Sequence, residues 1–141
     1  ELEILRLTRG EALSEQQAPA PQISQETLFE ARKDVLKLHL SEPLEQYLVQ
    51  LIIATRQPTK LDDTLANWLE YGASPRATIA LDKCARAHAW LQGRDFVTPE
   101  DIQSVFHNVL RHRIILSYEA QADGISKDQV LDRILELVAV P

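Results

Sequence analysis

Apolar residues recur at helical spacing along most of the chain, separated by polar stretches. The spacing predicts main helices over residues 24–36, 43–56, 75–91 and 98–110. A short helix is predicted within residues 62–71, and a capping box at Ser126 and Gln129 opens a last helix. Strand character is confined to residues 38–40 and 114–116, which we expect to pair with each other. The pattern therefore predicts an all-α helical bundle with at most two very short strands.

Residues 11–23 interrupt this pattern with a polar, proline-containing stretch. Such a composition favours extended conformations and has little to bury, so we predict a linker that is the most mobile internal segment. Before it, residues 1–10 form the end of a helix that Gly10 stops. The main domain is therefore predicted over residues 24–141.

Two helices carry the clearest core-facing stripes. The helix over residues 98–110 has the strongest amphipathic pattern, and we expect Phe106 to anchor the core. In the helix over residues 75–91, the predicted buried stripe consists of Ala77, Ala80, Leu81, Cys84 and Leu91. Leu81 is the second expected anchor, and Cys84 is expected to be a core thiol beside a half-buried His88.

Composition excludes several classes of protein. With 141 residues, 45% hydrophobic and 26% charged, the chain suits one globular domain. A net charge of -6 argues against nucleic-acid binding, and no apolar run approaches the ~20 residues of a membrane span. The single cysteine, Cys84, cannot form an internal disulfide, which favours the cytoplasm. Cys84 and His88 stand one helical turn apart, but without further ligands at metal spacing no metal site is predicted.

The candidate binding residue is Arg76, which residues 72–77 place in the first turn of a helix. Ser74 is a favourable N-cap, and Pro75 fits the first helical position, where no hydrogen-bond donor is lost. A guanidinium presents a planar fork of donors that matches phosphate oxygens, and a helix N-terminus favours anions. The helix dipole gives a cation no stability there. Arg76 is therefore either a phosphate ligand or a solvated arginine at a helix start.

Nothing in the chain binds a nucleoside triphosphate in the manner of a phosphate loop. None of the four glycines belongs to a G-x-x-x-x-G-K-[ST] motif, and no apolar strand ends in an acidic pair for magnesium. We therefore expect no catalytic residue in these 141 residues and no ATP hydrolysis by them alone.

Several further motifs accompany residues 72–77 in a fixed order. Residues 72–77 are followed by Gly-Arg-Asp-Phe-Val-Thr-Pro-Glu-Asp-Ile at residues 93–102, by Val-Leu-Arg-His-Arg-Ile-Ile-Leu at residues 109–116, and by a helix ending in Val-Ala-Val-Pro. Upstream, residues 52–56 end a helix in Ala-Thr-Arg. Together these motifs resemble the C-terminal lid of a MoxR-type AAA+ ATPase, a family of chaperone-like motors, and residues 1–5 resemble the last helix of its nucleotide-binding core.

The resemblance implies a function for the candidate residue. Arg76 would be the sensor-2 arginine, which reaches the γ-phosphate of ATP held by the core, and Ser74 and Pro75 are further candidates beside it. The lid would close over that ATP and couple hydrolysis to chaperone-like remodelling of partner proteins. ATP and Mg²⁺ would be cofactors of a longer parent protein, of which this chain is expected to be a part.

The resemblance also implies partners and boundaries. The partners would be the AAA+ core of the same polypeptide, the neighbouring subunits of a hexameric ring, and client proteins of unknown identity. Residues 1–10 would end the last core helix, residues 11–23 would be the linker, and residues 24–141 the lid.

Two questions stay open at this point. The chain could instead be a nucleotide-independent helical interaction or adaptor module, in which Arg76 is only a surface residue. Arg111, His112 and Arg113 could contact nucleotide or a neighbouring subunit, although a structural role at the end of their helix is favoured.

Overall fold

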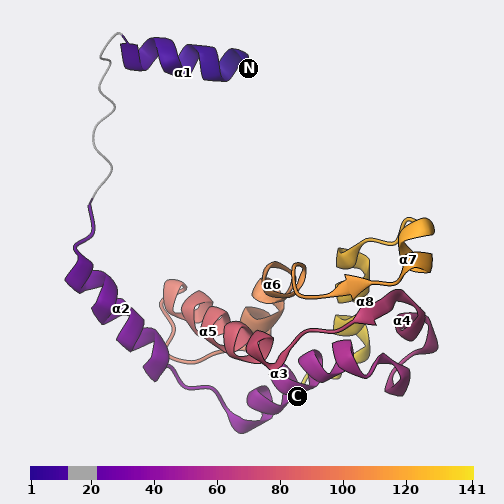
Figure 1. The fold of residues 1–141 in the computed structure, drawn as a ribbon. Helices are drawn as coiled ribbons and strands as arrows, with labels where there is room; N and C mark the ends of the chain where they lie inside the picture. The colour runs from indigo at the N-terminus through magenta and orange to yellow at the C-terminus, as the bar shows by residue number, and fades with distance from the viewer. Residues whose placement is uncertain (13–21) are drawn as a thin grey trace. The chain divides into compact units, whose positions relative to one another are not determined.

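A computed structural model of the protein describes residues 1–12 and 22–141 (Figure 1). The chain is mostly helical, with one small two-stranded sheet, which confirms the predicted all-α class. The helices are α1 (Leu2–Ala12), α2 (Gln25–Lys37), α3 (Glu42–Arg56), the 3₁₀ helix η1 (Pro58–Lys60), α4 (Asp63–Trp68), α5 (Pro75–Leu91), α6 (Pro99–Leu110), α7 (Tyr118–Ala122) and α8 (Lys127–Leu137). The strands are β1 (Leu69–Tyr71) and β2 (Ile115–Leu116). Among the described helices, none has the length and apolar character needed to cross a bilayer.

The chain divides into two compact units, Glu1–Arg32 and Lys33–Pro141. In the first unit, α1 continues through Gly10 to Ala12, so the prediction that Gly10 stops the helix is wrong. A single glycine costs a helix only about 1 kcal/mol relative to alanine, which neighbouring residues can offset. Of the predicted linker, residues 13–21 lie outside the described residues. Helix α2 has no buried residue, and its Leu28 and Phe29 side chains are exposed.

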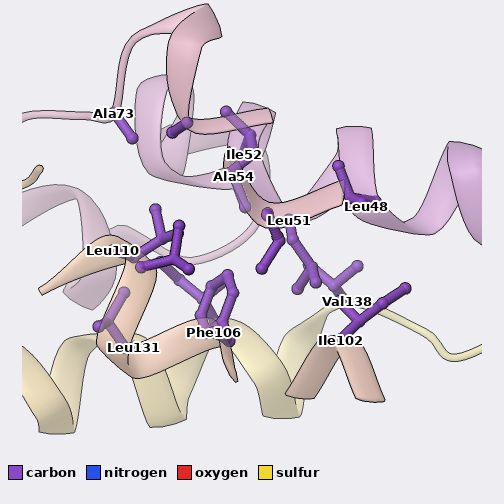
Figure 2. Packing of buried hydrophobic residues seen from close by; sticks show 14 of the residues in the cluster. Leu48, Leu51, Ile52, Ala54, Ala73, Ile102, Phe106, Leu110, Leu131 and Val138 are labelled. Atoms are coloured by element: carbon purple, nitrogen blue, oxygen red, sulfur yellow. The ribbon is translucent and has the colours of Figure 1, made fainter. Parts of the chain in front are cut away.

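The core of the second unit lies among α3, α5, α6 and α8 (Figure 2). Phe106 and Leu81 are fully buried, which confirms both predicted anchors. Each of these four helices buries residues spaced three or four apart, so that its apolar stripe faces the others. The labelled core residues are Leu48, Leu51, Ile52 and Ala54 of α3, Ala73 of the loop before α5, Ile102, Phe106 and Leu110 of α6, Leu131 of α8, and Val138 after α8.

The buried stripe of α5 differs from the prediction. Its buried members are spaced four apart and are Ala77, Leu81, Ala85 and Ala89. Cys84 is exposed, and 75% of Leu91 is accessible to solvent, so the predictions for these two residues are wrong. Helix α5 makes its most extensive contact with α6, and the small alanine side chains on this face let the two helices approach closely.

The small sheet also pairs differently from the prediction. Strand β1 pairs antiparallel with β2, with Leu69 opposite Leu116 and Tyr71 opposite Ile115. Residues 38–40 therefore do not pair with residues 114–116. Instead, the His39 N–H donates to the Asp95 carbonyl at 3.0 Å, and the Val97 N–H donates to the His39 carbonyl at 3.0 Å.

The helix predicted within residues 62–71 ends early, at Trp68, and becomes strand β1. At its start, the Asp62 carboxylate accepts the N–H groups of Thr64 and Leu65. At its end, the Asn67 carbonyl accepts the Ser117 hydroxyl, and the Trp68 carbonyl accepts the Ser117 N–H. The sheet thus follows α4 directly and leads the chain toward Gly72.

Candidate functional site

The loop before α5 is fixed against the end of α3. The Ala73 N–H donates to the Thr55 hydroxyl at 2.9 Å, and this hydroxyl donates to the Ile52 carbonyl at 2.7 Å. A Cβ atom on Gly72 would lie 2.2 Å from the Thr55 carbonyl oxygen, so only glycine fits there without a shift of backbone. Figure 2 shows Ala73 in the same cluster of buried residues as Ile52 and Ala54 of α3. Both segments stand out in the sequence as motifs, but nothing in the sequence indicates the contact between them.

The first turn of α5 begins where the sequence predicts. Ser74 occupies the N-cap position with φ -71° and ψ 165°, and Pro75 follows as the first helical residue. The Ser74 side chain makes no capping hydrogen bond, so its expected contribution as a cap is wrong even though its position is right. The N-terminus of α5 therefore lacks a side-chain acceptor of its own, which leaves it suited to an external anion.

Arg76 is exposed on this first turn. Within residues 1–12 and 22–141, its guanidinium makes no hydrogen bond and no ion pair. The next residue, Ala77, is fully buried, and its N–H donates to the Ser74 carbonyl at 2.8 Å. The backbone that carries Arg76 is thus anchored in the core, while its charged group faces solvent.

A different arrangement occupies the other end of α5. Asp101 of α6 is 1% exposed and accepts two hydrogen bonds from Arg94, at 2.5 and 2.6 Å. It also accepts the Thr98 N–H at 2.8 Å, and its Oδ1 lies 2.7 Å from Nδ1 of His88 on α5. Burial alone would raise the Asp101 pKa, but the bonds from Arg94, Thr98 and His88 outweigh it and hold this pKa well below its usual range.

This buried cluster was not predicted from the sequence. The only signal was Asp101 three residues after Thr98, the position from which an acidic side chain reaches back to the N-cap N–H. The same cluster explains His88, which bonds to Asp101 while Cys84 is exposed. Across residues 1–12 and 22–141, no group of three or more histidine, cysteine or acidic side chains is placed to hold a metal ion.

Arg111 and Arg113, whose role the sequence left open, make structural contacts. Arg111 donates to the Asp128 carboxylate of α8 at 2.6 and 3.1 Å, and Arg113 donates to the Val109 carbonyl. His112 is exposed and lies against the Arg113 guanidinium. These contacts connect the end of α6 to α8 and to its own last turn, in agreement with the favoured structural role.

A third arginine connects α8 to the start of α4. Arg133 donates to the Asp62 carboxylate at 2.6 and 3.2 Å. The Arg133 guanidinium, helped by the Leu65 N–H, lowers the pKa of Asp62 to about 2. Arg94, Arg111 and Arg133 are therefore each engaged by a carboxylate, whereas Arg76 has no partner among the described residues.

Comparisons with known proteins identify the domain. The AAA lid domain family matches residues 65–134, a range that includes Arg76 and the buried Asp101 cluster. The chain is 43% identical over 99 residues to Chaperone MoxR1 of Mycobacterium tuberculosis. The aligned region covers 70% of this chain and 26% of the relative. The chain belongs to the lid domains of MoxR-type AAA+ ATPases.

Two further proteins resemble this lid. Protein YeaC of Bacillus subtilis, which is uncharacterised, is 33% identical over 121 residues, covering 86% of this chain and 35% of YeaC. The crystal structure of a candidate ATPase from Cytophaga hutchinsonii superposes with a TM-score of 0.82 at 42% identity, covering 84% of this chain and 36% of that one. The lid chain therefore spans only about a quarter to a third of these relatives.

Proposed function

We propose that this lid closes over ATP held by an AAA+ core in the same polypeptide and that Arg76 contacts the terminal phosphate. The observation that supports this most is the state of Arg76 itself. It is an exposed guanidinium with no partner among the described residues, beside a helix N-terminus that its own N-cap side chain leaves uncapped. A bidentate cation in that position can stabilise charge on phosphoryl oxygens.

The residues of the lid fit an ATP phosphate better than they fit Mg²⁺. Arg76 supplies the positive charge. Ser74 supplies a hydroxyl beside it, and Pro75 forms the adjacent backbone at the N-terminus of α5. Asp62, Asp101 and Asp128 are held by arginines, so we assign the metal ligands to the core. When bound, ATP supplies the phosphoryl group for hydrolysis, and Mg²⁺ neutralises part of its charge.

The contact from Arg76 would couple nucleotide state to lid position. While a γ-phosphate is present, Arg76 holds the lid toward the core, and after its departure the guanidinium returns to solvent. The equilibrium between closed and open lid then shifts by the free energy of the lost contact. In a ring of such subunits, which the family resemblance implies to be hexameric, this movement would drive chaperone-like remodelling of partner proteins in the cytoplasm.

The test is the ATP turnover of the full-length protein with Arg76→Ala and Arg76→Lys. We expect alanine to lower kcat about tenfold or more and lysine to restore part of it, because an ammonium lacks the planar fork. Lys83→Ala is the matched control, since Lys83 is an exposed cation two turns further along α5. Undiminished turnover and unchanged ATP affinity in Arg76→Ala would instead favour the adaptor function.

Rings of mixed subunits would show which nucleotide Arg76 serves. Subunits carrying Arg76→Ala are combined with subunits whose phosphate loop is disabled. If Arg76 acts on a neighbour's ATP, some sites in the mixed rings regain activity. If Arg76 acts on the ATP of its own subunit, none do.

A further inference from the structure

We propose that Thr55 is a positioning residue for Arg76, acting through a hydrogen bond to the loop that carries it. This role rests on the proposed function of Arg76 as the phosphate contact. Thr55 lies at the end of α3 and does not approach the phosphate itself; it fixes the backbone from which Arg76 extends.

The Thr55 hydroxyl is buried and both donates and accepts a hydrogen bond. The residue is 1% exposed. Its Oγ1 donates to the Ile52 carbonyl at 2.7 Å and accepts the Ala73 N–H at 2.9 Å. One hydroxyl therefore joins the last turn of α3 to the loop before α5, across eighteen residues of sequence. A buried N–H that loses such an acceptor stays unpaired, so the loop would have to move to find another.

The backbone has little freedom between this bond and the Cα atom of Arg76. The segment Ser74–Arg76 is flanked by Ala73 and Ala77, which are both fully buried. Pro75 restricts its own φ, and Ser74 is held in an extended conformation at the helix N-cap. A displacement of Ala73 is therefore transmitted to the base of the Arg76 side chain rather than absorbed on the way.

Gly72 provides a second, steric constraint at the same place. Its α-carbon lies so close to α3 that a Cβ would approach the Thr55 carbonyl oxygen to 2.2 Å and the Arg56 nitrogen to 2.7 Å. The backbone of Thr55 thus limits how closely the loop before α5 approaches α3. The Thr55 hydroxyl fixes the position of Ala73 along the end of α3. The backbone position of Arg76 therefore depends on α3 as well as on α5.

The variants Thr55→Val, Thr55→Ser and Thr55→Cys in the full-length protein separate this role from simple packing. Valine keeps the shape and removes both the donor and the acceptor, serine keeps the hydroxyl, and cysteine replaces the hydroxyl with a somewhat larger thiol that is a weaker acceptor. We expect valine and cysteine to lower kcat for ATP about tenfold with a smaller change in KM, and serine to retain most activity. The matched control is Thr78→Val on α5, where the hydroxyl makes no hydrogen bond within the described residues.

A double-mutant cycle with Arg76→Ala tests whether Thr55 acts through Arg76. If Thr55 acts through Arg76, Thr55→Val or Thr55→Cys causes no further loss of kcat in the Arg76→Ala background. Equal losses in both backgrounds would overturn the positioning role, as would full activity of Thr55→Val while Arg76→Ala is impaired. If Arg76→Ala is itself fully active, the proposed function fails and the role of Thr55 fails with it.

Discussion

The two ends of α5 each present an arginine, and the two arginines are in opposite states. Arg94, just past the C-terminal end, donates two hydrogen bonds to the buried carboxylate of Asp101. Arg76, at the N-terminal end, is exposed and has no partner within residues 1–12 and 22–141. The same residue type is part of the protein's internal structure at one end and available to an external group at the other.

A buried acceptor distinguishes the structural arginine from the one that is available for binding. Asp101 is buried, so its charge must be matched inside the protein, and Arg94, Thr98 and His88 match it. Arg76 faces solvent, which satisfies its charge at no cost to folding. We infer that the end without an internal acceptor is the end that meets phosphate.

Both ends of α5 pack on the same core, and removing the largest fully buried side chain of that core should have the largest effect on stability. Phe106 is fully buried among α3, α6 and α8 (Figure 2). Phe106→Ala should lower the free energy of unfolding by about 3–5 kcal/mol, through lost burial and a residual cavity. Chemical denaturation of the 141-residue chain measures this. A loss below about 1 kcal/mol would show that the α6 stripe does not face the core.

The next largest effect on stability is expected at the C-terminal end of α5, where Arg94 pairs with Asp101. Asp101→Asn removes the charge that Arg94 and His88 share and should cost about 3 kcal/mol of unfolding free energy. The Asp101 pKa is lowered in the folded protein, so its stabilisation is complete above the unfolded pKa of about 3.9 and is lost as the pH falls below it. Stability should therefore drop between about pH 4 and pH 2, less steeply in Asp101→Asn; identical acid profiles would contradict this.

A smaller effect is expected from Gly72→Ala at the other end. The new Cβ would overlap the Thr55 carbonyl oxygen, and the loop must shift to relieve the overlap. We expect a loss of roughly 1–3 kcal/mol, measured as above. Gly93→Ala is a useful comparison, because Gly93 has a positive φ of 74° but nothing within 4 Å of an added Cβ. If Gly72→Ala were as stable as the unmodified chain, the loop could not lie as close to the Thr55 carbonyl oxygen as the structure places it.

The sequence predicted the parts of this account that depend on local chemistry. Helical spacing gave α5 with its observed ends, and Ser74 followed by Pro75 located Arg76 in the first turn. The motifs around residues 72–77 predicted the AAA+ lid family, which the comparisons confirmed. These predictions succeed because caps, proline positions and periodicity act within a few residues.

The sequence did not predict contacts between distant segments. The buried face of α5 passes through Ala85 rather than Cys84, because the close contact with α6 selects small side chains. The pairing of β1 with β2 depends on where α4 ends, and nothing in residues 114–116 specifies that partner. Which arginines are paired depends on carboxylates brought in from other helices, such as Asp128 for Arg111.

We propose that the Arg94 end of α5 serves the fold and that the Arg76 end serves the nucleotide. The most direct measurement compares Arg76→Ala with Arg94→Ala in the full-length protein, recording melting temperature and ATP turnover for both. We predict that Arg76→Ala changes stability by no more than about 0.5 kcal/mol yet loses most turnover, whereas Arg94→Ala lowers the melting temperature and retains turnover below it. A destabilised Arg76→Ala, or one that hydrolyses ATP as fast as the unmodified protein, would contradict the account.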